Sequence, residues 1–250
     1  MTLDSDWILP DWPAPLCIKA LITTRAGGSS TGDYTSLNLG WRTGDDADAV
    51  AANRARLRAV LPQEPKWLRQ VHGSVVSDAD TLTTDLPDAD ASIARLPGTV
   101  CAVLVADCVP VFFTNRAGTV VAIAHAGWRG LAGGVIERTV AVIGGHPGDL
   151  LAYLGPGIGP QAFEVGPDVR EAFLAGDPHD AAAFTAHVPG KWLADLFLLT
   201  RRRLQRAGVQ RVFGGGTCTY SDPARFYSYR RDRTTGRMAA LIWREEADAT

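Results

Sequence analysis

The sequence predicts an α/β protein in which buried strands and amphipathic helices follow one another, and three observations support this fold class. A short apolar, β-branched run, Thr119–Ala124, has strand character, and helical apolar spacing follows it from Leu131 to Ile143. The run Thr99–Ala106 is apolar on both faces, which is typical of a central strand of a sheet. The strongest helical pattern, Lys191–Ala207, has leucines on one face and arginines on the other.

The first third of the chain contains three further predicted elements around a long loop. Leu16–Thr24 reads as a strand, and a Gly/Ser-rich loop over 25–40 follows it. Asp45–Leu61 is expected to be helical, with acidic residues at its start and prolines just after its end. Alternating polarity predicts a strand over 67–76, and residues 78–87 are polar and turn-rich.

Proline and glycine divide the rest of the chain into short elements. Pro110 predicts a break after Cys108 and a new strand beyond it, because proline cannot donate to a regular ladder. The remaining elements are expected to be a hairpin turn at 115–118, a strand at 150–154, a helix at 167–174, an irregular stretch at 177–189, and strands at 209–213, 226–232 and 238–243. There is no internal repeat and no linker, so we expect a single domain spanning 1–250.

Composition excludes several classes of protein. The 250 residues carry a net charge of −2, so no overall basic field favours nucleic acid or anionic lipid as a partner. No apolar run reaches the length of a membrane span, and the N-terminus lacks the apolar core of a signal peptide. The four cysteines lie far apart, without a CxxC pair, which favours free thiols in a reducing compartment. We therefore expect a cytoplasmic protein whose partners are small molecules, and we further expect a monomer.

Three residues form a candidate metal site, since His72, Cys108 and His125 each follow or end a predicted strand. Imidazole and thiolate together suit Zn²⁺, and three protein ligands leave a fourth position open, as in catalytic zinc sites. Water bound there would lose its proton near neutral pH. The alternative interpretation is a pair of hydrogen-bonded histidines and a buried structural thiol, because buried cysteine is common.

Other polar residues stand beside strand ends and glycine-rich loops. Asp107, next to Cys108, either orients a histidine ligand or simply ends its strand. Cys218 follows three glycines, where the backbone can approach a ligand closely. Four arginines could hold an anion such as phosphate together with loop N–H groups, the alternative being ordinary surface solvation: Arg25, Arg129, Arg230 and Arg231.

Ordered motifs along nearly the whole chain resemble the YfiH family, whose members were once described as polyphenol oxidases or laccases. The two most specific motifs are Asp107-Cys-Val-Pro-Val and His125-Ala-Gly-Trp-Arg-Gly. Gly157 is a minor departure, since relatives often have alanine there. The other motifs are Thr24-Arg-Ala-Gly-Gly, Ser36-Leu-Asn-Leu-Gly, Gln70-Val-His-Gly, Ala89-Asp-Ala, Gly155-Pro-Gly-Ile-Gly-Pro, Phe163-Glu-Val-Gly, Cys218-Thr-Tyr, Phe226-Tyr-Ser-Tyr-Arg-Arg-Asp and Thr235-Gly-Arg-Met.

The resemblance implies an α/β (α+β) sandwich of mixed β-sheets flanked by helices, related to a group of cysteine hydrolases. It also implies one zinc ion held by His72, Cys108 and His125. Members of the family are purine nucleoside phosphorylases, which split adenosine, inosine, guanosine and S-methyl-5'-thioadenosine with phosphate, and they also deaminate adenosine. The zinc-deaminase signature with paired Pro-Cys-x-x-Cys cysteines is absent from this chain, so such a site would be built differently.

Three alternative functions remain at this point. A cysteine-type hydrolase would use Cys108 as nucleophile and His125 as base to remove misincorporated L-serine from a UDP-MurNAc peptidoglycan precursor. A metal-binding regulatory module would bind zinc without turnover. A multicopper polyphenol oxidase is disfavoured because the chain has only five histidines, although copper can replace zinc at a single site.

The expected roles follow from the resemblance and from residue chemistry. Cys108 and His125 are expected at the reaction centre. A general base or a supporting carboxylate is expected from Asp90, Asp107 or Glu164. Phosphate and substrate contacts are expected from Arg25, Asn38 and Arg129. The turn 155–160 and Cys218 are expected to line the pocket.

Overall fold

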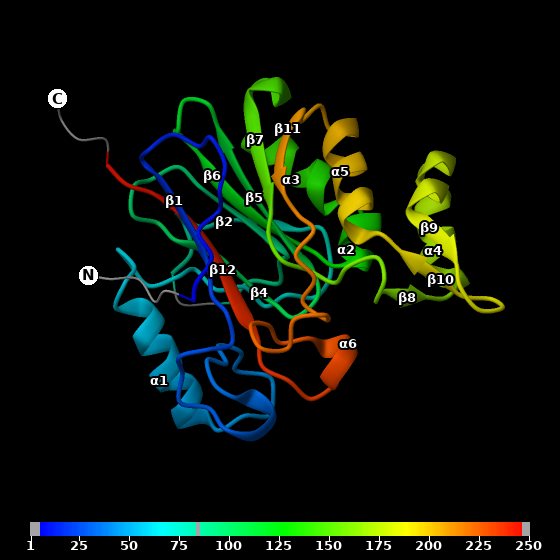
Figure 1. The fold of residues 1–250 in the computed structure, drawn as a ribbon. Coiled ribbons are helices and arrows are strands. Elements are labelled where there is room, and N and C mark those ends of the chain that lie inside the picture. Colours follow the sequence, from blue (N-terminus) through cyan, green and yellow to red (C-terminus); the bar gives the residue numbers. More distant parts are fainter. Residues whose placement is uncertain (1–5, 84–85, 247–250) are drawn as a thin grey trace.

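Two β-sheets packed face to face form the centre of the fold, and helices cover both outer sides (Figure 1). The computed structural model describes residues 6–83 and 86–246. The larger sheet has the strand order β11 (Arg211–Gly214), β7 (Leu150–Leu154), β5 (Val109–Asn115), β6 (Val121–Ala126), β3 (Ala91–Ala94) and β2 (Val76–Asp78). The smaller sheet has the order β1 (Ile18–Ile22), β12 (Met238–Arg244) and β4 (Cys101–Val105). The β11–β7 and β2–β3 pairs are parallel and the other pairs in these two sheets are antiparallel, so the larger sheet is mixed.

Helices lie on the outer face of each sheet. The outer face of the smaller sheet packs on α1 (Ala47–Arg58), which Asp46 caps by accepting the Ala49 N–H. The outer face of the larger sheet packs on α2 (Trp128–Ala132), α3 (Val135–Ile143) and α5 (Leu196–Arg206). The remaining elements are α4 (Pro167–Leu174), α6 (Tyr229–Asp232), a small sheet of β8 (Glu164–Val165), β10 (Trp192–Ala194) and β9 (Phe184–Ala186), and 3₁₀ turns at Gly32–Tyr34, Pro147–Asp149 and Pro178–Ala183.

The layers arise from the alternation of side chains along the buried strands. In β5, Val111 and Phe113 join the core beneath the helices, whereas Phe112 joins the core between the two sheets. In β6, Ile123 likewise faces the smaller sheet. Every residue of β6 is buried, because both faces of the strand are covered. The predicted class, a sandwich of mixed sheets flanked by helices, is confirmed.

Most predicted elements occur within a few residues of their expected bounds. The break after Cys108 is present, and β5 starts at Val109. The prediction that Thr99–Ala106 forms a central strand is wrong in one respect, because β4 is at the end of its sheet and pairs there with β12. Its apolar pattern reflects burial between layers, with α1 on one side and the larger sheet on the other.

The strand predicted over 67–76 is absent except for Val76, where β2 begins. The chain turns at 71–73 instead, because the Asp90 carboxylate accepts the N–H groups that a neighbouring strand would otherwise accept. His72 there has a φ of 59°, a left-handed conformation that strands do not use.

Four other expectations are corrected by local backbone signals. The helix predicted over 131–143 is two helices, since Gly134 at φ 88° separates α2 from α3. The helix predicted over 191–207 begins only at Leu196, after strand β10 and the cap Asp195. The stretch 177–189 is not wholly irregular, because it contains a 3₁₀ helix and β9. The strand predicted over 226–232 is replaced by α6, which Ser228 caps by accepting the Arg231 N–H.

Within the described ranges, no helix is both long and apolar enough to cross a membrane. The first five residues, on which part of the expectation about the N-terminus rests, lie outside those ranges.

Candidate metal centre and active-site cavity

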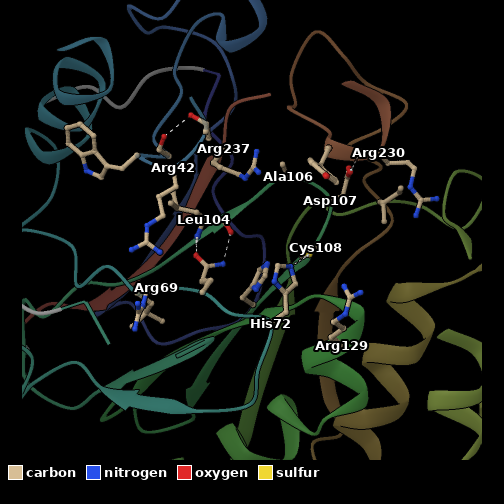
Figure 2. A pocket seen from close by; sticks show the side chains of 18 of the residues that line it. Arg42, Arg69, His72, Leu104, Ala106, Asp107, Cys108, Arg129, Arg230 and Arg237 are labelled. Carbon is tan, nitrogen blue, oxygen red and sulfur yellow. Dashed lines mark hydrogen bonds between the residues drawn. The ribbon is translucent and has the colours of Figure 1, made fainter. Parts of the chain in front are cut away.

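The three predicted metal ligands meet in space, although they are remote in the sequence. His72 is on the loop before β2, Cys108 is in the turn between β4 and β5, and His125 is near the end of β6. Their donor atoms all lie within 4.8 Å of one another, and Cys108 Sγ is 3.9 Å from His72 Nε2. The two imidazole rings have their centroids 4.9 Å apart in an edge-to-face arrangement. Figure 2 shows His72 and Cys108 side by side at the middle of a cavity.

A single buried carboxylate positions both histidines. Asp90 Oδ1 accepts the backbone N–H of His72 at 3.0 Å and lies 2.9 Å from His125 Nδ1. Its Oδ2 accepts the N–H groups of Val71 and Gly73 at 3.1 and 2.7 Å. Because Nδ1 of His125 is committed to Asp90, Nε2 remains as the donor for a metal. Asp90 therefore orients the ligands, and its oxygens are already occupied rather than ready to accept a substrate proton.

Charges are strongly coupled within this cluster. Burial opposes ionisation of the Cys108 thiol, but His125 and His72 together lower its pKa to about 6. Burial likewise opposes protonation of His125, but Cys108 and Asp90 raise the pKa of its imidazole to about 9. Burial works against the Asp90 carboxylate as well, yet its hydrogen bond with His125 leaves its pKa below the usual value. Without metal, the cluster is thus a thiolate–imidazolium pair between these two pKa values.

We expect Cys108 to be the cysteine that is alkylated fastest in protein from which metal has been removed with a chelator. Thiolate is the reactive form, so the rate should reach half its plateau near pH 6 and stay flat above pH 7. Burial raises the pKa of Cys101 to about 12, so that residue should stay unlabelled. The measurement is iodoacetamide labelling followed by mass spectrometry of the cysteine peptides. A Cys108 rate that climbs through pH 8–9, as for an ordinary thiol, would contradict the pairing.

The donors and their surroundings fit one zinc ion. Two imidazoles and a thiolate form a borderline-soft set that zinc prefers, and tetrahedral zinc places sulfur and nitrogen ligands about 3.5 Å apart, near the observed 3.9 Å. Gly127 makes room beside them. A Cβ at this position would lie 2.8 Å from Cys108 Sγ and 2.9 Å from His72 Cδ2. Three protein donors leave the fourth position of the ion to the cavity.

The cavity has a volume of about 570 Å³ and is unusually basic. Asp107 is the one carboxylate among the described lining residues, and both of its oxygens are occupied. Aromatic side chains form much of the remaining wall, namely Trp41, Trp67, Trp128, Phe163 and Tyr229. Seven arginines line it: Arg42, Arg54, Arg69, Arg129, Arg230, Arg233 and Arg237.

Asp107 joins two segments of the wall. Its backbone has a φ of 98°, and its Oδ1 accepts the Thr219 hydroxyl at 2.6 Å. Its Oδ2 accepts the backbone N–H of Arg230 at 2.7 Å, which ties α6 to the turn that carries Cys108. In this arrangement Asp107 supports the site rather than presenting a free base to it.

The expected substrate ligands outside the cavity have other partners. Arg25 donates to the backbone oxygens of Thr35 and Pro223 and stacks on Tyr227. Asn38 is fully buried and bonds Thr43 and Asp45. These two residues hold the 25–45 loop together, and neither lines the cavity. The expectation that they contact phosphate is therefore not supported by their positions.

Glu164 and Cys218 also lie outside this cavity. The Glu164 carboxylate is half-exposed, near His187, and lines a second, shallower hollow. Cys218 Sγ accepts the Gly159 N–H at 3.1 Å. Of the expected turn 155–160, Ile158 reaches the cavity wall.

Of the four arginines predicted for anion binding, Arg129 and Arg230 line the cavity. Arg231 instead donates to the carbonyls of Thr219, Tyr220 and Phe226. Sequence reasoning missed five lining arginines: Arg42, Arg54, Arg69, Arg233 and Arg237. Two signals could have found some of them: Gly40-Trp-Arg, in which an aromatic residue and a cation follow a glycine in a loop, and the motif Thr235-Gly-Arg-Met, which contains Arg237.

Comparison with known proteins gives consistent matches over nearly the whole chain. Purine nucleoside phosphorylase YfiH of Escherichia coli K12 is 54% identical over 241 residues, which cover 96% of this chain and 99% of that protein. A protein of the same enzyme name from Pseudomonas aeruginosa is 51% identical over 241 residues, with the same coverage.

Solved structures agree with the sequence matches. A Neisseria meningitidis protein has a TM-score of 0.93 at 50% identity, covering 96% of this chain and 100% of its own. YlmD of Geobacillus stearothermophilus has a TM-score of 0.90 at 32% identity, covering 98% of each chain. Residues 19–245 match the sequence model of the family described as multi-copper polyphenol oxidoreductase laccase. The chain therefore belongs to this family, that of the YfiH proteins.

Proposed function

We propose that this protein is a zinc-dependent purine nucleoside phosphorylase that acts on adenosine, inosine, guanosine and S-methyl-5'-thioadenosine, and that it also deaminates adenosine. One observation carries the proposal: a His-Cys-His donor set lies at the middle of a basic cavity with aromatic walls. Such a cavity suits a flat heterocycle and an anion together. The enzyme name of the closely similar relatives supports the same activity. We place it in the cytoplasm, acting on small molecules.

The phosphate site in this proposal is formed by α2 and α6 rather than by the loop after β1. Arg129, at the start of α2, makes no ion pair or hydrogen bond through its guanidinium within the described part of the chain and lies against Trp128. Arg233 follows α6 and likewise lacks a carboxylate partner among the residues described. Arg230 lies over Phe163 and lines the same cavity. Guanidinium groups without counter-charges are the natural ligands of a phosphate dianion.

Phosphorolysis breaks the bond between sugar C1' and the base nitrogen and forms a bond from C1' to a phosphate oxygen. The protein's share is to hold the two reactants in contact and to keep water from the sugar, which is a large part of the rate gain for such a displacement. Arg129 and Arg233 would hold the phosphate, and Asp90 would hold His125 and His72 in position. Zinc, when bound, would supply a Lewis acid and, for deamination, a water of lowered pKa.

A specific observation also favours a second candidate, a cysteine-type hydrolase that removes misincorporated L-serine from a UDP-MurNAc precursor. Cys108, His125 and Asp90 are arranged as nucleophile, base and orienting carboxylate. This chemistry would need the metal-free thiolate. Copper oxidation by a multinuclear cluster has less support, because the described residues contain one group of metal ligands, so copper would act there only as a substitute for zinc.

The test is to incubate zinc-loaded protein with inosine and phosphate and to measure hypoxanthine and ribose 1-phosphate by chromatography. We expect Arg129→Ala and Arg233→Ala each to raise the KM for phosphate at least about 10-fold, with the KM for inosine changed less than about 2-fold, because a charged hydrogen bond contributes about 1.5–3 kcal/mol.

The matched control is Arg138→Ala, which removes an exposed arginine of α3 that is outside the cavity. Absence of both products from the zinc-loaded wild type would refute the phosphorylase. Release of serine from the UDP-MurNAc precursor by protein freed of metal with a chelator would favour the hydrolase.

A further inference from the structure

The metal centre divides the cavity into two ends with different walls. Figure 2 shows Arg42, Leu104 and Arg69 on one side of His72 and Cys108, and Arg129 and Arg230 on the other. The end with Arg129 and Arg230 is the phosphate site proposed above. The opposite end is built from the loop 40–43, α1, the segment 67–70 and β4. Its wall combines large apolar side chains with cations.

A fixed stack of three side chains forms the core of that opposite end. The guanidinium of Arg54, on α1, lies 4.1 Å from the ring centroid of Trp67 and 5.3 Å from that of Trp41. Arg54 is held in place, because its Nε donates to the Leu39 carbonyl at 2.9 Å. The Trp67 indole N–H donates to Glu64 at 3.2 Å. The stack is therefore in place before any ligand binds.

Trp41 is the solvent-exposed member of this stack. It is 49% exposed, which is unusual for a tryptophan, and it lines the cavity. Trp67 is only half-buried as well, and Leu68 and Leu104 continue the apolar wall beside it. The Gln70 amide exchanges hydrogen bonds with the backbone of Leu104 at 2.9 and 2.8 Å, which fixes the segment 67–70 against β4. An exposed aromatic face on a rigid cavity wall is suited to stack on a flat ring.

We propose that Trp41, backed by Arg54 and Trp67, is the surface on which the purine base stacks, so that the substrate lies across the metal centre with its base at the Trp41 end and phosphate at the Arg129 end. This proposal rests on the proposed phosphorylase function. It makes Trp41 a substrate-binding residue. None of the three stacked residues was expected to have a role from the sequence.

The reaction geometry supports the same orientation. In a displacement at C1', the phosphate oxygen replaces the base nitrogen, and the two atoms lie on opposite sides of C1'. The two ends of the cavity lie on opposite sides of His72 and Cys108, so a nucleoside held in this way presents C1' between them (Figure 2). The cation-rich end then faces the phosphate, and the aromatic end faces the purine base.

The experiment measures binding without turnover. Inosine and inorganic phosphate are each titrated, one at a time, into zinc-loaded wild type, Trp41→Ala and Trp41→Phe by calorimetry. Removing one stacking partner of a base typically weakens binding by about 5- to 150-fold. We expect the Kd for inosine to rise by about 10- to 100-fold in Trp41→Ala and by less than about 3-fold in Trp41→Phe. The Kd for phosphate should change by less than about 2-fold in both.

Trp192→Ala is the matched control, because Arg170 covers Trp192 at 5.2 Å in a similar stack outside the cavity. Thermal unfolding of each variant checks that the fold is intact. An inosine Kd in Trp41→Ala within 2-fold of wild type overturns this inference and leaves the phosphorylase standing. An equal loss in Trp192→Ala also overturns it, because the effect is then not local. A wild type that binds neither inosine nor inorganic phosphate refutes the proposed function itself.

Discussion

Replacing Cys108 by alanine is expected to remove zinc from the protein and to lower kcat/KM for inosine phosphorolysis by at least about 1000-fold. The variant leaves two imidazoles whose donors are already oriented by Asp90, but two neutral ligands bind zinc far more weakly than a set that includes a thiolate. A bound metal ion contributes several kcal/mol to the stabilisation of a transition state, which corresponds to a factor of this size. Zinc per chain is measured by atomic emission, in parallel with the rate.

Cys218→Ala is the control for this experiment. Cys218 is also a partly buried free cysteine, but its sulfur accepts the Gly159 N–H and lies outside the cavity. It should keep a full zinc content and an unchanged rate. If Cys108→Ala loses its zinc and keeps phosphorolysis, the metal is not part of that reaction. If metal-free wild type releases serine from the UDP-MurNAc precursor and Cys108→Ala does not, the Cys108 thiolate is a nucleophile.

Asp90→Asn is expected to weaken zinc binding and kcat/KM by about 10- to 100-fold, although Asp90 is not a ligand. Carboxylates that orient a metal-binding histidine typically have effects of this size. The structural reason is that Asp90 accepts the N–H groups of residues 71–73 and engages His125. An asparagine amide offers one oxygen and two donors where acceptors are needed, so some of these contacts must be lost.

The control must separate a local effect from general destabilisation. Asp180 is equally buried and is paired with Arg202 and Arg206, and none of these three residues lines the cavity. Asp180→Asn should therefore lower the melting temperature as much as Asp90→Asn, or more, while its zinc affinity stays at the wild-type value. Zinc affinity is measured by competition with a chromogenic chelator. Equal losses of zinc affinity in both variants would show that Asp90 acts only on overall stability.

The candidate metal ligands could be proposed from the sequence because their chemistry is rare and local. An imidazole or thiolate at the end of a buried strand has few structural roles, so His125 and Cys108 stand out without knowledge of the fold. The arginines of the cavity do not stand out in this way. Arg25 and Arg129 both lie within two residues of a glycine and look alike in the sequence. Arg25 nevertheless donates to the backbone carbonyls of Thr35 and Pro223, whereas Arg129 lines the cavity. Only the tertiary structure distinguishes them.

The mistaken elements have a related cause. The run 67–76 alternates in polarity but forms no strand before Val76, and its consecutive residues 67–70 all line the cavity. The backbone there is held by a carboxylate 17–19 residues away in the sequence. Tyr229–Asp232 is capped locally by Ser228, but it is also held by Asp107, more than a hundred residues earlier, which accepts the Arg230 N–H. Local patterns cannot report partners at such separations.

The turn 106–108 is where the chain leaves the smaller sheet and enters the larger one, and it also carries Cys108. His125 belongs to the larger sheet alone, so the spacing between thiolate and imidazole depends on how the two layers are seated on each other. Phe112 and Ile123 from one layer and Val103 from the other fill that seam. Truncating these side chains would therefore leave the three candidate ligands in the chain but change the spacing between them. The expected result is a lower affinity for the metal ion.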